Sequence, residues 1–238
     1  RLNLVPLEGF IELLREVKEP EEIEFITMAV GISDKAVGHI TDWAHAGMTE
    51  REVAWEIERF MRENGSQSIP FEVIFASGPN SALPHASPSR RRINTGEPIV
   101  IDIGARYNGY CSDLSRTICL GEPDDTFKKI YDIVLSAQLS AIAIIKEGMS
   151  GAEADSIARA VIEEAGYKER FGHALGHGVG LVCHEQPRLG PNSGELLASG
   201  MVFSVEPGIY LPGRGGVRIE DLVSYGRYYQ PDCRHQSR

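Results

Sequence analysis

The chain has 238 residues, a length that suits one large domain or two small ones, and its 34 acidic and 24 basic side chains give a formal net charge of −10. This acidic balance argues against nucleic acid or an anionic membrane surface as the main partner. Hydrophobic residues make up 42% of the chain, as in soluble globular proteins, yet the longest apolar runs, such as 139–145, are far shorter than the ~20 residues needed to cross a bilayer.

Four helices are predicted from apolar periodicity and from end signals. Thr49-x-x-Glu52 and Ser150-x-x-Glu153 are capping boxes, and a glycine follows the last periodic residue of each helix. The predicted helices cover residues 20–47, 49–65, 125–146 and 150–166. Strand-like runs cover residues 71–76, 98–104, 110–120, 201–205 and 216–224. Because pairs of helices alternate with groups of strands that include hairpins, we expect an α+β fold with an antiparallel sheet.

The cysteines and the first residues bear on the cellular compartment. The four cysteines, at positions 111, 119, 183 and 233, show no CxxC spacing, which excludes a zinc ribbon and a thioredoxin-type motif. The first 15 residues carry charges and no continuous apolar segment, so no signal peptide is predicted. Scattered thiols without such a segment favour a reducing compartment, and we expect a cytoplasmic protein.

Two parts of the sequence resemble each other around an acidic residue. Asp102 ends one apolar run and Glu206 ends another, each six residues after a glycine. A second acid follows each of them, Asp113 after eleven residues and Glu220 after fourteen, and two predicted helices precede each part. The sequence therefore predicts two related halves, each with two carboxylates.

The dipeptide Asn108-Gly109 is a strong signal for a two-residue hairpin turn. With that turn, Asp102 pairs with Ser115 and lies diagonally across from Asp113 on one face, with backbones ~7–8 Å apart. Two ionised carboxylates aimed at one point repel each other, and a divalent metal between them is the economical solution. The alternative for Asp102 alone is a turn-forming residue at a strand end.

Glu206 and Glu220 raise the same question in the second half. Glu206 ends the apolar run 202–205, where a buried acid needs a partner. Strand alternation places Arg218 and Glu220 on one face and Asp221 on the other, so the spacing does not decide whether Glu220 or Asp221 binds a metal. A surface ion pair between Arg218 and Glu220 is the alternative for this stretch.

Three histidines, His173, His177 and His184, lie in a glycine-rich segment, where a regular helix is unfavourable and backbone can approach a ligand closely. The spacing is not HExxH, which excludes a zincin. His85 lies in the turn-rich loop 83–88; for any one of these histidines, a polar core position is the alternative. Four acids with imidazoles suit two Mn²⁺-like ions better than a tetrahedral thiolate zinc site.

Together these motifs resemble the catalytic domain of the pita-bread-fold metallopeptidases, which include aminopeptidase P, prolidase, methionine aminopeptidase and the metal-free creatinase. The similarity is greatest to the bacterial Xaa-Pro peptidase branch. The resemblance implies a curved antiparallel sheet flanked by helices, in two pseudo-related halves. It rests on LPHASPS (83–89), VIDIGARYNGYCSDLSRT (100–117), FGHALGHGVGLVCHEQP (171–187), FSVEPGIYLPG (203–213) and GGVRIEDLV (215–223).

The resemblance also implies a role for each site residue. It makes Asp113 and Glu220 bridging ligands of two divalent ions, expected to be manganese, with cobalt or zinc as alternatives. The full set of implied metal ligands is Asp102, Asp113, His177, Glu206 and Glu220. The implied catalytic residues are His85, His173, His184 and Glu206. The same three histidines face the substrate, and further substrate-lining positions are Tyr210 and Arg218.

The implied activity is hydrolysis of the Xaa-Pro bond at the N-terminus of peptides by a hydroxide that bridges the two ions. Glu206 then passes a proton to the leaving nitrogen, while His184 and His85 stabilise the tetrahedral oxyanion. A prolidase restricted to Xaa-Pro dipeptides is the alternative within this class. A binding protein without activity and a metal-free hydrolase like creatinase are disfavoured, because all five ligands are present.

Members of this branch carry an N-terminal domain before the catalytic domain. We therefore interpret residues 1–19 as the remnant of a linker and residues 20–238 as the catalytic domain, which is expected to form a homodimer. The final residues 226–238 depart from the usual closing segment of the family.

Overall fold

The computed structural model describes residues 6–7, 9–224 and 227–228. All four predicted helices are confirmed; two of them begin at the predicted residue, and the other ends differ by one to four residues. A short helix before them, α1, was not predicted, because residues 1–19 show no helical end signal. The helices are α1 (Phe10–Glu16), α2 (Pro20–Trp43), α3 (Glu50–Glu63), α4 (Asp125–Ile144) and α5 (Gly151–Glu164).

The capping boxes explain where α3 and α5 begin. The Thr49 hydroxyl accepts from the backbone N–H of Glu52, and the Glu52 carboxylate accepts from the backbone N–H of Thr49. Ser150 and Glu153 make the same reciprocal pair at α5. Both boxes were predicted from sequence spacing and are confirmed.

The strands pair in antiparallel fashion throughout the described residues, as predicted. In the first half of the molecule, residues 20–119, the strands are β1 (Ile74–Ser77), β2 (Pro98–Ile103), β3 (Arg106–Tyr107), β4 (Tyr110–Cys111) and β5 (Leu114–Cys119). In the second half, from residue 125, they are β6 (Gly176–Gly178), β7 (Glu185–Leu189), β8 (Val202–Val205), β9 (Gly208–Leu211), β10 (Gly215–Arg218), β11 (Asp221–Ser224) and β12 (Arg227–Tyr228).

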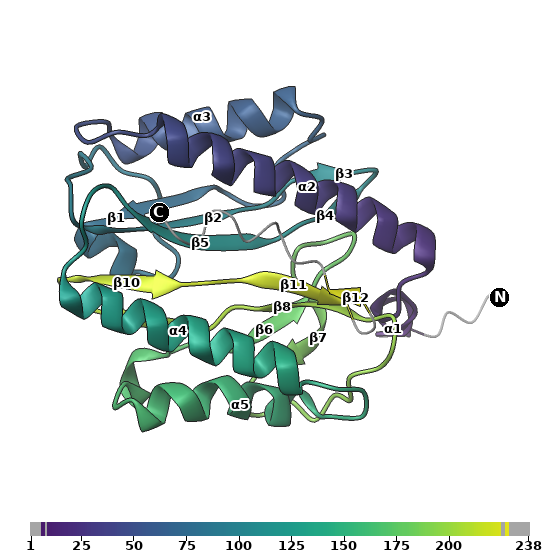
Figure 1. Ribbon diagram of the computed structural model, residues 1–238. Helices are drawn as coiled ribbons and strands as arrows, with labels where there is room; N and C mark the ends of the chain where they lie inside the picture. The colour runs from purple at the N-terminus through teal and green to yellow at the C-terminus, as the bar shows by residue number, and fades with distance from the viewer. Residues whose placement is uncertain (1–5, 8, 225–226, 229–238) are drawn as a thin grey trace.

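Each half packs a pair of helices on its own sheet, and the two sheets meet in the middle of the molecule (Figure 1). Helices α2 and α3 cover the sheet β1-β2-β5, with a core that includes Ile57 and Phe75. Helices α4 and α5 cover the sheet β12-β11-β8-β6-β7, with a core that includes Ile130 and Phe203. This arrangement agrees with the two-part organisation predicted from the acidic motifs.

Two predicted strands are each broken in two by an acidic residue. The run 110–120 forms β4 and β5, with Ser112 and Asp113 between them, and the run 216–224 forms β10 and β11, with Ile219 and Glu220 between them. The predicted hairpin turn is confirmed: Asn108 and Gly109 have positive φ angles of 46° and 87°. Apolar patterning did not reveal the breaks, because it reports burial and not the direction of the backbone.

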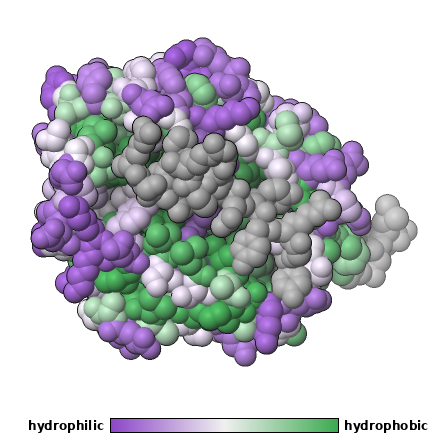
Figure 2. Space-filling model, in the orientation of Figure 1, coloured by the Kyte–Doolittle hydropathy of each residue, from purple (hydrophilic) through white to green (hydrophobic). Residues whose placement is uncertain are grey.

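The outer surfaces of the two helix pairs differ in character. Figure 2 shows mainly polar residues at the top of the view, over α3, and apolar residues across the lower half, over α4. On α3, Arg59 and Arg62 form ion pairs along the helix, whereas Leu139 and Ile144 of α4 are about half exposed. Within the described residues, every helix is too short or too polar to span a membrane.

Candidate metal centre

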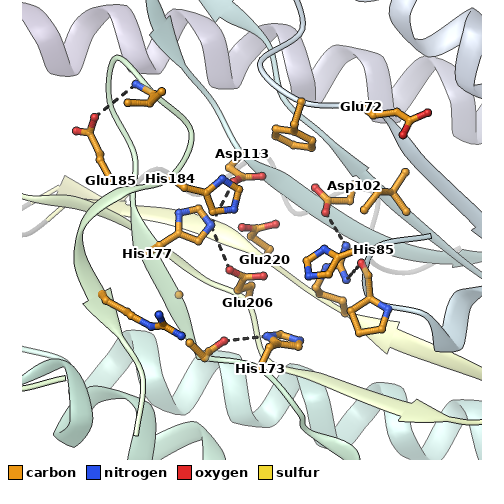
Figure 3. A pocket seen from close by; sticks show the side chains of 18 of the residues that line it. Glu72, His85, Asp102, Asp113, His173, His177, His184, Glu185, Glu206 and Glu220 are labelled. Atoms are coloured by element: carbon orange, nitrogen blue, oxygen red, sulfur yellow. Dashed lines mark hydrogen bonds and ion pairs between the residues drawn. The ribbon is translucent and has the colours of Figure 1, made fainter. Parts of the chain in front are cut away.

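A cavity of about 860 Å³ lies where the two sheets meet. Both halves line it, and Figure 3 shows the side chains that point into it. Of the ten residues predicted for the site, Tyr210 alone is absent from the lining, and its hydroxyl lies behind His173. The nine lining residues are His85, Asp102, Asp113, His173, His177, His184, Glu206, Arg218 and Glu220.

Each half brings two carboxylates to the cavity from positions at or next to strand ends. Asp102 lies near the end of β2, opposite Ser115 of β5, in the predicted register. Asp113 lies in the break before β5, Glu206 directly follows β8, and Glu220 lies in the break before β11. In Figure 3 the carboxylates of Asp113, Glu220 and Glu206 form a row down the middle of the view.

The central groups lie close enough to share a metal ion. One ligand atom each of Asp113, His177 and Glu220 lies within 4.8 Å of the others. His177 Nε2 is 3.6 Å from Asp113 Oδ2 and 3.4 Å from Glu206 Oε1. The groups therefore come from both halves of the chain.

The electrostatics of the carboxylates favour a bound cation. Burial, together with the neighbouring charges of Asp102 and Glu206, raises the pKa of Asp113 well above its usual range. Burial and the charge of Asp113 do the same to the pKa of Glu220, and burial raises the pKa of Glu206 to about 8. A divalent ion would offset both the burial and the repulsion.

Asp102 gives a second sign that a positive group fits this site. Its Oδ1 atom is buried and has no hydrogen-bond partner within the described part of the chain. Its Oδ2 atom accepts from Arg218 Nη2 at 2.6 Å. A buried carboxylate oxygen without a donor is costly, and a metal ligand bond would satisfy it. The donor set of carboxylates and one imidazole therefore fits hard divalent ions.

Arg218 is buried, so the alternative of a surface ion pair with Glu220 is wrong. Its side chain is 3% exposed, and its partners are Asp102, the Ser115 hydroxyl and the Tyr210 hydroxyl. Ser115 in turn donates to Glu220 Oε2 at 2.7 Å. Because β10 ends at Arg218, strand alternation does not extend from Arg218 to Glu220.

The structure separates Glu220 from Asp221, which the spacing left open. Glu220 lines the cavity, whereas Asp221 accepts from Arg116 Nη2 at 2.7 Å and from Gln138 Nε2 at 2.6 Å. Arg116 Nη1 also donates to the backbone carbonyls of Ser115 and Glu220. Asp221 thus belongs to an ion pair behind the cavity wall.

The histidine-rich segment is held by close backbone packing. A side chain at Gly176 would place Cβ 1.9 Å from the carbonyl oxygen of Ser204, and one at Gly178 would place it 2.0 Å from that of Gln186. These glycines let β6 pair with β7 and β8. The prediction that this segment avoids a regular helix is therefore confirmed.

Burial lowers the pKa of all three histidines in this segment. Burial lowers the pKa of His173 to about 4, and burial with the nearby charge of His184 lowers the pKa of His177 to about 4. His173 Nδ1 donates to the carbonyl of Ala174 at 2.8 Å, and its Nε2 accepts from the Tyr210 hydroxyl at 2.9 Å. The His177 and His184 rings lie 4.1 Å apart.

Sequence reasoning missed several residues that support the site. Asp155 of α5 forms a two-point ion pair with Arg159 and accepts from the backbone N–H of Leu175. The Cys183 thiol donates to Asp113 Oδ2 at 3.1 Å. The i,i+4 spacing of Asp155 and Arg159 was a usable signal, since it is typical of a helical ion pair. Cys183 gave no signal beyond a scattered thiol.

Comparisons with known proteins agree with this geometry. The sequence pattern of metallopeptidase family M24 matches residues 24–225. The chain is 49% identical over 217 residues to the Xaa-Pro dipeptidase of Pyrococcus furiosus, which covers 91% of this chain and 62% of that protein. It is also similar to the solved structure of a Bacillus anthracis Xaa-Pro dipeptidase, with a TM-score of 0.91 and 49% identity over 93% of this chain and 62% of that one.

A third similarity is to a relative named for a different activity. The structure of an X-Pro aminopeptidase from Thermotoga maritima has a TM-score of 0.90 and 44% identity, over 92% of this chain and 62% of that one. The chain thus spans a little under two thirds of the length of these relatives. The predicted pita-bread fold is confirmed by these structural likenesses.

Proposed function

This chain belongs to metallopeptidase family M24, and from that membership we propose that it hydrolyses the Xaa-Pro bond at the N-terminus of peptides. The observation that supports this most directly is the convergence of four carboxylates and an imidazole on one cavity. Such a cluster is unfavourable without bound cations and is suited to two divalent ions.

We propose that the ligand set implied by the resemblance would hold two divalent ions. Asp113 and Glu220 would serve both ions, Asp102 would serve one, and His177 with Glu206 would serve the other. Manganese is the proposed metal, because oxygen ligands predominate, with cobalt or zinc as alternatives. When bound, the ions supply an activated water and a Lewis acid for the scissile carbonyl.

The remaining residues bind and orient the peptide. His85 and His184 line the cavity on opposite sides of the carboxylate row and donate to the oxygen of the scissile carbonyl as negative charge develops there (Figure 3). Glu206 accepts a proton from the attacking water and passes it to the leaving nitrogen. His173 orients the substrate, and the Tyr210 hydroxyl, which Arg218 also contacts, holds the His173 ring from outside the cavity.

The alternative is a prolidase that accepts only Xaa-Pro dipeptides. The similar proteins are named both as dipeptidases and as an aminopeptidase, so both substrate lengths have support. The two differ in whether the free carboxylate that follows proline in a dipeptide is required. The cytoplasmic location and the homodimer stay predictions, to be tested by cell fractionation and by light scattering.

The decisive experiment compares release of the first residue from an Xaa-Pro-Yaa tripeptide and from an Xaa-Pro dipeptide after loading with Mn²⁺. Cleavage of the tripeptide supports the proposed aminopeptidase, and cleavage of the dipeptide alone supports the prolidase. A chelator should abolish either activity, and added Mn²⁺ should restore it. A folded protein that holds two ions per chain and cleaves neither peptide would overturn the proposal.

A further inference from the structure

The loop that carries His85 is fastened at both of its ends to a single side chain. This loop, residues 77–89, begins at Ser77, the last residue of β1, and includes the short 3₁₀ turn Gly78–Ala82. At Ser77, the backbone N–H and the hydroxyl both donate to Glu50 Oε1, each at 2.8 Å. At Ser89, the backbone N–H and the hydroxyl donate to Glu50 Oε2, at 3.0 and 2.6 Å.

Glu50 is the first residue of α3 and is fully buried, at 0% exposure. Its hydrogen-bond donors are neutral groups, and the Asn80 amide adds contacts of 3.1 Å to each oxygen. A buried carboxylate is costly unless its lone pairs are satisfied, and here several donors satisfy it. Its position at the N-terminus of α3 further stabilises the negative charge. The Glu50 carboxylate therefore fixes the positions of the loop residues that donate to it.

The middle of the loop reaches the cavity and contacts the second half of the molecule. The carbonyl of Pro84 accepts from Arg218 Nη1 at 3.0 Å, and the Ser81 hydroxyl accepts from the backbone N–H of Gly216 at 2.9 Å. Within the described residues, the His85 imidazole itself makes no hydrogen bond to the protein. The course of the loop backbone therefore sets the position of the His85 ring.

We propose that Glu50 is a positioning residue, whose carboxylate fastens both ends of the 77–89 loop and thereby sets the place of His85 against the substrate. This inference rests on the proposed function for the role of His85. Glu50 itself lines no part of the cavity. It acts only through the loop, and His85 is the side chain of the loop to which the proposed function gives a catalytic role.

The test replaces Glu50 by Gln, which keeps the shape of the side chain. The substitution turns one carboxylate oxygen, an acceptor, into an NH₂ group that faces the donors of the loop. In the Mn²⁺-loaded protein, Glu50→Gln lowers kcat for Xaa-Pro-Yaa hydrolysis about tenfold to a hundredfold, while KM changes less than about twofold, because a misplaced catalytic group costs on that scale. In the His85→Ala background, Glu50→Gln causes no further loss. An equal loss in both backgrounds would show a general structural defect and overturn the inference.

The matched control is Glu56→Gln, which removes another buried carboxylate from the same helix. Glu56 is 7% exposed and contacts Arg59 and His39 but not the loop. It should leave kcat within about twofold of the wild type, since no group at the cavity moves. A loss of kcat as large as that of Glu50→Gln would count against the inference.

Amide hydrogen exchange gives a readout that does not depend on activity. Glu50→Gln should speed exchange at Ser77 and Ser89, across residues 78–88 and at Gly216, whose N–H donates to Ser81, with β2 and the rest of the second half unchanged. If Glu50→Gln fails to fold, Ser89→Ala removes one donor and should produce the same pattern at about two- to fivefold lower kcat. Unchanged exchange in the loop overturns the inference, whether or not the wild-type protein cleaves Xaa-Pro peptides.

Discussion

The two halves of the molecule hold their histidines in different ways. In the first half, one buried carboxylate, Glu50, gathers both ends of the loop that carries His85 through neutral hydrogen-bond donors. In the second half, Asp155 is paired with Arg159, and Arg159 also donates to the carbonyls of Phe171 and His173. Both anchors come from the second helix of their pair, α3 and α5.

The two anchors should therefore affect different properties: the first should affect the position of a site residue, and the second the stability of the fold. The first anchor, Glu50, binds neutral donors from one loop, so its loss should act mainly where the middle of that loop reaches the cavity. The second anchor is an ion pair buried on α5, and the adjoining glycines are packed against backbone, so damage there should spread to the core. The halves therefore share a layout but should respond differently to equivalent changes.

The largest effect is expected from removing one carboxylate from each half. Glu220→Gln and Asp102→Asn should each lower kcat/KM by at least about 10³-fold and reduce bound metal, because a ligand is lost. Without metal, however, Glu220→Gln should raise the melting temperature by a few degrees, since it removes one repelling charge. Asp102→Asn should lower it, because buried Arg218 then lacks its carboxylate partner. Melting curves with and without chelator, and metal analysis, check both signs.

The next effect tests the glycine packing of the second half. Gly176→Ala should cost more than about 3 kcal/mol of the free energy of unfolding in urea, because Cβ meets the Ser204 carbonyl inside the sheet. Gly194→Ala is the control, since no atom lies within 4 Å of a Cβ at that position. Similar stabilities for the two variants would show that the backbone packing around β6 is looser than described.

A smaller effect compares the two anchors directly. Asp155→Asn should lower the free energy of unfolding by about 3 kcal/mol, because it leaves Arg159 without its partner and weakens the acceptor for Leu175. Glu50→Gln should cost less, about 2 kcal/mol, because it strands neutral donors only. Urea denaturation measures both, with exposed Glu164→Gln as the control on α5. A larger loss of the free energy of unfolding for Glu50→Gln than for Asp155→Asn would contradict the contrast between the halves.

The smallest expected effect is the pH dependence that His173 imposes. Its pKa in the folded protein is about 4, below the ordinary value of 6.5, so the folded state binds fewer protons than the unfolded state between these values. The contribution of His173 to stability is therefore complete above pH 6.5 and is lost as the pH falls toward 4. At pH 5.5 the loss is about 1 kcal/mol relative to pH 7. His173→Gln should lack this part of the pH dependence in urea titrations; an unchanged slope would contradict it.

The sequence predicted most of the fold, because helix ends and tight turns depend on local chemistry. Thr49 and Ser150 located the starts of two helices within one residue, and Asn108-Gly109 located the hairpin. The strands β6, β7, β9 and β12 were not predicted, since none of them shows a continuous β-branched run. The breaks before β5 and β11 depend on tertiary contacts between the halves, which local patterns do not contain.

The acids and the clustered histidines of the candidate site could be singled out from the sequence, whereas His85 and Tyr210 depended on the resemblance. The structure brings nine of the ten predicted residues together at the cavity, and the residues that support them were not predicted. The partners of Arg218 could not be predicted, because Asp102 and Ser115 lie more than 100 residues away along the chain. Glu50 was not singled out at all, since an acid at the start of a helix ordinarily needs no explanation beyond the helix dipole.

The ion pair behind the cavity has a consequence for mutational tolerance. Arg116 satisfies three acceptors at once, the carbonyls of Ser115 and Glu220 and the carboxylate of Asp221. Lysine could carry the charge but could not span these acceptors with a planar fork. In a library of all substitutions selected for activity, position 116 should therefore retain arginine almost alone, although its side chain lies outside the cavity. Neighbouring Thr117, whose hydroxyl bonds only backbone atoms of Arg218, should accept serine.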